Sequence, residues 1–579
     1  MEKKSKKVIV YTICFACIML IDWTRGSQPW HVWATCINLT GVVLSVIMLS
    51  HFSLKKVPFS RYLIWLLIWL TGSGVGYLIW RADPGEVFLP QYLAAAVSVG
   101  CMGIVALQLW QERKTLRSAK QGNLFLTVLW VILSVLMLVS RFSELWPLWY
   151  LILFGMFYIV PFTQEEKRGL WDGLANGVII FFFLIQIFAY GFRPYDEVRY
   201  KGAYGNCNIN SMMYLMTFIM ILYKIHCLCW KQNGEKKTWK QRLGLIFFFV
   251  LAAGLFSFLL FTMTRTAILV AAGILVVYGI LEAFVLHKVK WWKIVARGAA
   301  FCLCVVLTVP CVYLTIRYLP TILHHPVWWE GEYSVNKVHS YDPSNSEKYV
   351  TWDEAMELML GRMYLGSTEV SLEEEDQESA YNSILLASND TSLGEGTLTL
   401  LASDMTNREA NDITNNETND ITSSVANDTA YAEKLLTDAE KILLTEEEAN
   451  SSMRVRLEIY KRYWNHLNWN GHILEEGYFP ITEDYHAWHA QNVFLQIAFY
   501  HGIPAGICFI LLMIGLGVWA VKLAIKGGRK ENILPLLIGM FFIGYGMMEC
   551  VWYLGQGVLF FLYLIPRIMI DDRTNKVNE

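Results

Sequence analysis

The chain has 579 residues, of which 55% are hydrophobic and 17% charged, and its formal net charge is −2. This apolar balance excludes an ordinary soluble protein and predicts an all-α polytopic membrane protein. Lys and Arg stand in short clusters between apolar runs, whereas most acidic residues stand in one long polar insert. The net charge therefore identifies no partner, and no nucleic-acid partner is expected.

The 12 Cys residues lie almost wholly within apolar runs, and the insert from about 320 to 485 contains none. A disulfide framework is not expected for this insert, even if it lies outside the cell. Thiols placed in apolar runs do not indicate a structural zinc site. Neither a metal nor a cofactor is predicted.

Apolar runs of about 17 to 25 residues predict helical membrane spans. The N-terminal run is interpreted as an uncleaved first span, because no small-residue cleavage site follows it. The boundaries beside Thr264 and near the C-terminus are the hardest to place, so about 12 to 14 transmembrane helices are predicted. The runs are 8–24, 31–50, 62–80, 91–110, 123–141, 145–162, 174–192, 209–230, 243–261, 266–286, 295–318, 497–521, 531–549 and 552–570.

Clusters of Lys and Arg precede the first span and follow every second one. Cytoplasmic loops carry such an excess, so both termini are predicted to be cytoplasmic. Residues 1–318 then form a membrane domain with about eleven spans. Residues 319–490 form a large extracytoplasmic loop before the last three spans at 491–570, and residues 571–579 form a cytoplasmic tail.

The large loop has a low-complexity middle and a structured end. Residues at about 389–430 repeat Asn-Asp-x-Thr-like units, a composition typical of disorder. Residues 452–467 place Val455, Ile459 and Tyr463 at four-residue intervals. This spacing predicts an amphipathic helix.

Three outer segments carry polar residues at membrane level, where such groups are costly and often functional. In the first segment, Arg199 can form a bidentate contact with an anion, and Asn206 and Asn208 can cap the following helix. An Arg beside a helix N-terminus suits a phosphate group. The alternative is an ordinary loop before a capped helix.

The second segment contains Arg265. This residue lies in a Thr-rich break between two predicted spans, and no acidic residue is nearby in the sequence. The alternative is an Arg that reaches the lipid headgroups.

The third segment contains Arg454 and Arg456 of the amphipathic helix, followed by His486, His489 and Asn492. Histidine can act as an acid or a base near neutral pH. Interfacial His can also be an ordinary belt residue, and this interpretation is favoured for His501.

In this order, the three segments resemble the O-antigen ligase and O-antigen polymerase superfamily of integral membrane glycosyltransferases. That superfamily has an RxxGxxxNPN-like element, an SR element and, after a large outer loop with an Arg-rich helix, an HxHNxxL element followed by GxxG. Cys207 replaces the Pro, and Gln491 replaces the second His, so both His486 and His489 are candidates for the base. The matching positions are Arg199, Gly202, Asn206, Asn208, Thr264, Arg265, Arg456, His489, Asn492, Leu495, Gly502 and Gly506.

The resemblance implies that a glycan is transferred from a polyprenyl-diphosphate carrier to a glycan or lipid-linked acceptor on the outer face of a bacterial plasma membrane. His489 is expected to deprotonate the acceptor hydroxyl, and Arg265 to stabilise the leaving diphosphate. No metal is needed where arginine supplies the charge. The lipid bilayer and other polysaccharide assembly proteins are further candidate partners. The expected substrate-binding residues are Arg199, Arg456, Asn206, Asn208, Asn492 and His486.

A surface-polysaccharide polymerase is favoured slightly over a ligase, which delivers the glycan to a separate lipid, wall or protein acceptor. Two other classes stay open. A transporter or flippase of lipid-linked saccharide could use Arg199 and Arg265 along its pathway, although no internal repeat supports this class. A structural or sensory protein could use the insert to bind a partner.

Overall fold

The computed structural model describes most of the chain outside the large insert. Arg199, Asn206, the low-complexity stretch, the predicted span 552–570 and the tail 571–579 fall outside the described residues, as does half of 145–162. The described residues are 2–26, 31–53, 57–82, 89–113, 124–142, 152–153, 155–157, 159–192, 200, 202–204, 207–230, 238–286, 289–322, 352–363, 452–481, 486–487, 489–526 and 530–548.

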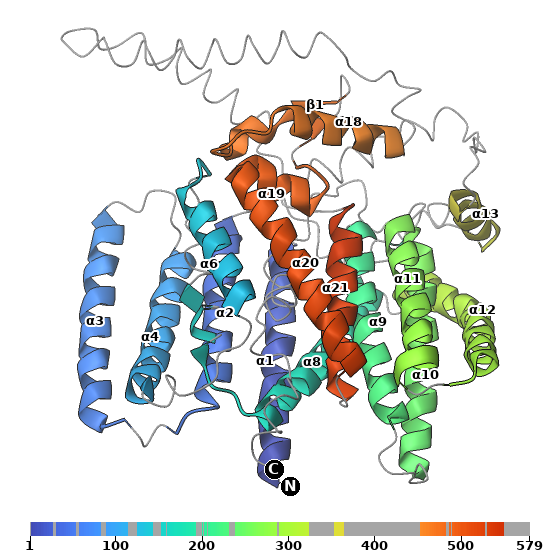
Figure 1. Cartoon of the computed structure of the whole chain (residues 1–579), viewed down its shortest axis with the longest axis horizontal. Coiled ribbons are helices and arrows are strands. Elements are labelled where there is room, and N and C mark those ends of the chain that lie inside the picture. The colour runs from blue at the N-terminus through green and yellow to red at the C-terminus, as the bar shows by residue number, and fades with distance from the viewer. Residues whose placement is uncertain are drawn as a thin grey trace.

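Long apolar helices make up most of the described chain (Figure 1). Eight of the helices within it are long and apolar enough to cross a membrane, and two shorter apolar helices accompany them. The protein is therefore a predominantly helical, multi-pass membrane protein. The bundle helices are α1 (Glu2–Gly26), α2 (His31–Leu49), α3 (Phe59–Ala82), α4 (Leu89–Gln111), α6 (Leu124–Val139), α8 (Gln164–Phe192), α9 (Cys207–Cys229), α10 (Trp239–Thr262), α11 (Arg265–Leu281), α12 (Trp291–Ile322), α20 (Ile503–Lys526) and α21 (Ile533–Gly546).

Shorter elements lie at one end of the bundle, which we call the α18 face; the opposite end, where α1 begins, is the α1 face (Figure 1). Side-chain contacts support this division. At the α1 face, Glu166 binds Lys7 and His51. At the α18 face, Arg141 binds Glu476 at 2.9 Å. The shorter elements are the 3-10 turn η2 (Gly202–Tyr204), α13 (Trp352–Met363), α18 (Ser452–Asn465), the hairpin of β1 (Phe479–Pro480) and β2 (His486–Ala487), and α19 (Val493–His501).

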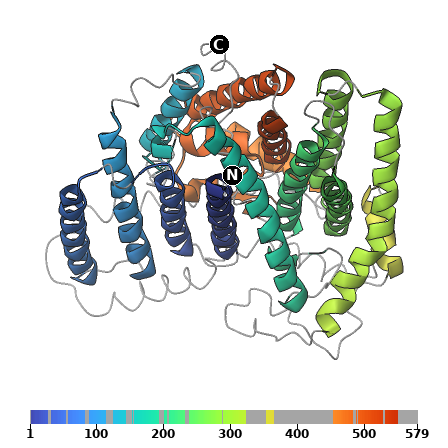
Figure 2. The same ribbon diagram turned by 90° about the horizontal axis from the view of Figure 1, so that it is seen from below.

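The helices pack in a row that runs α3, α4, α2, α1, α8, α9, α10 and α12, seen from the α1 face in Figure 2. Packing is closest where small residues let two backbones approach, as membrane helices require. A Cβ atom on Gly173 of α8 would lie 2.5 Å from Tyr11 Cβ of α1. The peripheral α3, by contrast, has no buried residue.

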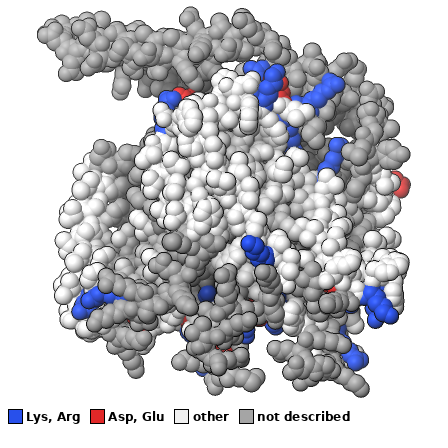
Figure 3. All heavy atoms as spheres, in the orientation of Figure 1, with Lys and Arg blue, Asp and Glu red and all other residues white. Residues whose placement is uncertain are grey.

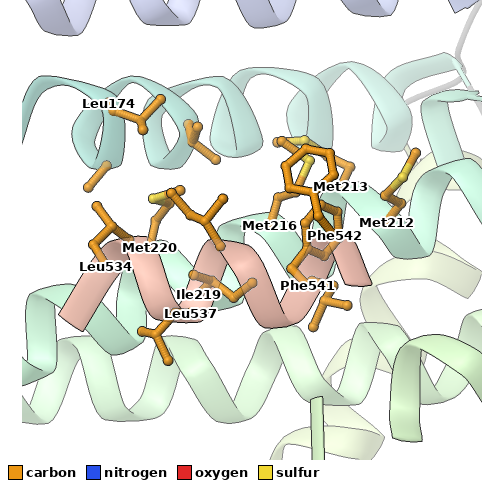
Figure 4. Packing of buried hydrophobic residues seen from close by; sticks show 14 of the residues in the cluster. Leu174, Met212, Met213, Met216, Ile219, Met220, Leu534, Leu537, Phe541 and Phe542 are labelled. Atoms are coloured by element: carbon orange, nitrogen blue, oxygen red, sulfur yellow. The ribbon is translucent and has the colours of Figure 1, made fainter. Parts of the chain in front are cut away.

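Helix α9 is the most buried span, and α21 covers it (Figure 4). Met213 and Met216 of α9 meet Phe541 and Phe542 of α21 in this core. The flexible thioether fills irregular gaps and contacts aromatic rings favourably. This packing holds the end of α21 at the α18 face, beside the start of α9.

The predicted span 497–521 is not one helix, because the chain breaks at Gly502 into α19 and α20. Gly502 has φ of 89°, and its backbone lies against a loop at 468–471. Ile503 N donates to Asn468 O at 2.9 Å. A Cβ atom on Gly502 would lie 2.3 Å from Trp469 O. Hydropathy could not predict this break, since both halves are equally apolar.

Gly471, on the facing loop, is expected to tolerate no side chain. It has φ of 80°, and an added Cβ atom would lie 2.1 Å from Tyr500 O. Gly471→Ala should destabilise the protein by about 1–3 kcal/mol or more, measured as a lower thermal unfolding temperature in detergent. Gly254→Ala is the control, because Gly254 lies in α10 with nothing within 4 Å of its added Cβ. A similar loss in both variants would contradict the close approach at Gly471.

Candidate functional site

The first two sequence segments pack against each other at the α18 face. Tyr200 N donates to Phe261 O at 3.0 Å, and Thr264 Oγ1 donates to Cys207 O at 3.4 Å. Between α10 and α11 the chain turns at Met263, which has φ of 50°. The turn therefore brings the first residue of α11 beside the first residue of α9.

Arg265 is that first residue of α11, and its side chain is exposed. Among the described residues it has no carboxylate partner, unlike Arg141, which binds Glu476 on the same face. A helix N-terminus adds partial positive charge from its backbone N–H groups. Arg265 is thus placed to attract an anion.

Asn208 lies inside the first turn of α9, which begins at Cys207, so it is not the predicted N-cap. Its carbonyl oxygen accepts hydrogen bonds from Ser211 Oγ at 2.8 Å and Tyr545 Oη at 2.6 Å. The Tyr545 contact attaches the start of α9 to the end of α21. Asn208 therefore joins two parts of the site through its backbone.

Gly202 shows why the first segment needs glycine. It has φ of 58°, and an added Cβ atom would lie 2.5 Å from Asn210 Nδ2. Asn210 is buried, and within the part of the chain that the structure describes no hydrogen-bond acceptor meets the distance and angle criteria for this amide nitrogen. A side chain at position 202 would displace the turn from the start of α9.

The third segment forms a small core of its own. Ile459 and Tyr463 of α18 pack against Phe479 of β1 and against Phe499 and Tyr500 of α19. The four-residue spacing predicted this buried face. Arg456 and Tyr460 stand toward the end of α21 instead, where Arg456 Nη1 lies 3.8 Å from Met548 Sδ.

His489 is the candidate whose chemistry the structure defines best. Gln491 N donates to His489 Nδ1 at 3.2 Å. Burial, together with the charge of Arg456, lowers the pKa of His489 to about 4. The ring is therefore neutral at pH 7, and because Nδ1 accepts a hydrogen bond, the hydrogen is on Nε2.

This tautomer bears on the expectation that His489 is the base. Nε2 already carries a hydrogen, so it can donate to an anion and cannot accept a proton. The base role requires the other tautomer, in which Nδ1–H would face the Gln491 N–H. Donation from Nε2 needs no rearrangement.

Asn492 shapes the loop that carries His489. Its Oδ1 caps α19 by accepting from Phe494 N at 3.0 Å and Leu495 N at 3.1 Å. Its Nδ2 donates to Met547 O at 3.1 Å. Both ends of the amide thus bind within the protein: Oδ1 as an N-cap, and Nδ2 in a contact with the end of α21.

The other two histidines have different surroundings. His486 lies in β2, and its ring stacks on Tyr478 with centroids 4.5 Å apart. Burial lowers the pKa of His486. His501 Nδ1 lies 3.0 Å from Ser140 Oγ, which attaches α19 to the end of α6. His501 therefore has a structural contact with the residue that follows α6.

The end of α21 joins the segments into one site. Met547 O accepts from Tyr460 Oη at 2.9 Å and from Asn492 Nδ2 at 3.1 Å. Tyr545, two residues earlier, binds the start of α9. Asn208, Arg456, His489 and Asn492 therefore belong to one connected network, and Gly544 packs closely against Val270 of α11, the helix that Arg265 begins.

Sequence reasoning missed Tyr460 and Tyr545, which connect this network. Tyr460 lies one helical turn after Arg456, a signal that could have drawn attention to it. Tyr545 lies in an apolar span and has no such signal.

In the view of Figure 3, several Lys and Arg side chains stand along the α18 end of the molecule, with Asp or Glu side chains beside some of them. Among the described residues, no group of three His, Cys, Asp or Glu side chains is placed to hold a metal ion. Arginine and neutral histidine are the groups that this site offers to an anion. No protein family, curated protein or solved structure was found to match the chain.

The pKa of His489 predicts how stability changes on acidification. The folded-state pKa of about 4 lies below the ordinary value of 6.5, so between these values the folded chain binds fewer protons. Stability is full above about pH 6.5 and is lost as the pH falls towards 4, by at most about 3 kcal/mol. Thermal unfolding in detergent should follow this window. His489→Gln cannot titrate there and should lack this component, so identical pH dependence in both proteins would argue against the shift.

Proposed function

We propose that the α18 face transfers a glycan from a polyprenyl-diphosphate carrier to an acceptor hydroxyl on the outer side of a bacterial plasma membrane. A surface-polysaccharide polymerase is the preferred form of this activity. The observation that carries the proposal is that Arg456 lies beside neutral His489, with Arg265, which has no carboxylate partner among the described residues, at an adjoining helix start. Both termini are then cytoplasmic, in keeping with the Lys and Arg distribution.

The chemistry needs positive charge where the diphosphate leaves. The acceptor oxygen forms a bond to the anomeric carbon, and the bond from that carbon to the diphosphate breaks with its electron pair on the diphosphate. Arg265 and Arg456 offset the developing negative charge, and the Nε2–H of His489 donates to a diphosphate oxygen. The acceptor proton leaves to solvent or to the released diphosphate.

The lipid part of the donor favours a site at the membrane boundary. Arg265 begins a helix that crosses the bundle, so a diphosphate bound there has its polyprenyl chain at the level of the apolar helices. A soluble nucleotide-sugar donor would need no such placement.

Purified full-length protein in vesicles, given a synthetic polyprenyl-diphosphate oligosaccharide with a labelled glycan, tests the proposal. We expect products longer than the donor glycan and release of polyprenyl diphosphate, in the presence of EDTA as in its absence. Transfer only to an added non-carrier acceptor would favour the ligase. Movement of intact donor across the bilayer without transfer would favour the flippase and overturn the enzyme proposal.

A further inference from the structure

Tyr460 reaches two backbone carbonyl groups across the candidate site. Its Oη lies 2.9 Å from Met547 O and 3.3 Å from Gln491 O. A phenol has one hydrogen to donate, so these two carbonyl groups share it with Met548 Sδ, which lies 3.9 Å away. The hydroxyl therefore ties α18 both to the end of α21 and to the residue whose N–H binds His489.

Gln491 is the residue that orients His489. Its φ of 46° lies in the left-handed region, which a residue with a side chain adopts when its surroundings hold it. The N–H of Gln491 donates to His489 Nδ1, and its carbonyl accepts from Tyr460. These two bonds lie on opposite sides of the Gln491 Cα atom, so together they restrain both of its backbone angles.

We propose that Tyr460 is a positioning residue, whose hydroxyl holds Gln491 so that the Gln491 N–H fixes His489 in the tautomer with hydrogen on Nε2. The effect on transfer rests on the proposed function, whereas the effect on His489 does not. Tyr460 acts through Gln491 and Met547 and contacts no reacting group.

Loss of the hydroxyl has a chemical consequence at His489. Without Tyr460 Oη, the Gln491 backbone loses a hydrogen bond that helps to hold it in the left-handed region, and its N–H can turn away from Nδ1. Nδ1 can then carry the hydrogen itself or accept a proton. The ring loses its single tautomer, and its protonation becomes easier because an N–H donor no longer stabilises the neutral form.

Nuclear magnetic resonance of full-length protein labelled with ¹⁵N in the histidine rings tests the proposal. The His489 signals are assigned by their absence in His489→Gln. In the wild type we expect one Nε2–H tautomer. In Tyr460→Phe we expect a mixture of tautomers, a rise in the titration midpoint of His489 and, with the lipid-linked donor, a transfer rate about tenfold lower.

Tyr463→Phe is the matched control, because it removes a tyrosine hydroxyl from the same helix. Tyr463 Oη donates to Gly477 O inside the small core. This variant should lower the unfolding temperature and leave the His489 tautomer unchanged. A wild-type tautomer and titration midpoint in Tyr460→Phe would overturn the proposal. A changed tautomer in Tyr460→Phe, with no transfer by the wild type, would support the positioning role and reject the proposed function.

Discussion

His489→Gln is expected to keep transfer activity within about tenfold of the wild type, whereas His489→Ala loses about a hundredfold or more. The glutamine amide can place an N–H close to the position of His489 Nε2–H, which the Gln491 contact leaves as the donor. Glutamine cannot act as a base. The measurement is the initial rate of glycan transfer in vesicles.

His489→Asn is the matched control for geometry. Its shorter amide reaches the region of Nδ1 rather than Nε2, so it should resemble alanine. If glutamine and alanine are equally inactive while both proteins fold, proton donation is not the role of His489. The base role, with the opposite tautomer, would then be the better account.

Arg456→Ala and Arg265→Ala are each expected to lower the transfer rate about a hundredfold to a thousandfold, because each removes a fixed charge from the position where the diphosphate leaves. Arg265→Lys should retain part of the activity, because lysine supplies a positive charge but cannot form a bidentate contact with the diphosphate. In Arg456→Ala the pKa of His489 should also rise, since the Arg456 charge is one cause of its depression. The initial rate of glycan transfer and the ¹⁵N-detected titration of the His489 ring measure these effects.

Two other arginines, Arg454 and Arg141, serve as controls for these variants. Arg454→Ala removes a charge from the exposed side of α18, two residues before Arg456, and should change the rate little. Arg141→Ala breaks the pair with Glu476 and should lower stability more than the rate. Equal loss in Arg454→Ala and Arg456→Ala would show a diffuse electrostatic effect rather than a defined site.

The four-residue spacing of Val455, Ile459 and Tyr463 predicts the buried face of α18, because amphipathic periodicity reports which side of a helix faces a core. The same spacing says nothing about Arg456 and Tyr460, which meet the end of α21. Their partners lie about ninety residues away in the chain.

The sequence identifies some of the candidate residues, but not the contacts that they make. Arg265, Arg456 and His489 stand out in the sequence because ionisable groups at membrane level are unusual. The assignment of Asn492 to substrate binding rested on the family pattern, whereas in the structure its Oδ1 caps α19 and its Nδ2 donates to Met547 O. The ring nitrogen on which His489 carries its hydrogen depends on the conformation of the Gln491 backbone, and the sequence does not predict that conformation.

The sequence by itself determined that this is a multi-pass helical membrane protein and where most of its long apolar helices lie, because transfer to a bilayer is a sum of local residue contributions. The tertiary structure alone decided the break at Gly502, the attachment of Asn208 to Tyr545, and the meeting of Tyr460, Asn492 and Met547. These features depend on the close approach of backbones and on shared carbonyl acceptors between distant segments. Hydropathy cannot predict such contacts, because it describes the environment of each residue and does not identify the residue's partner.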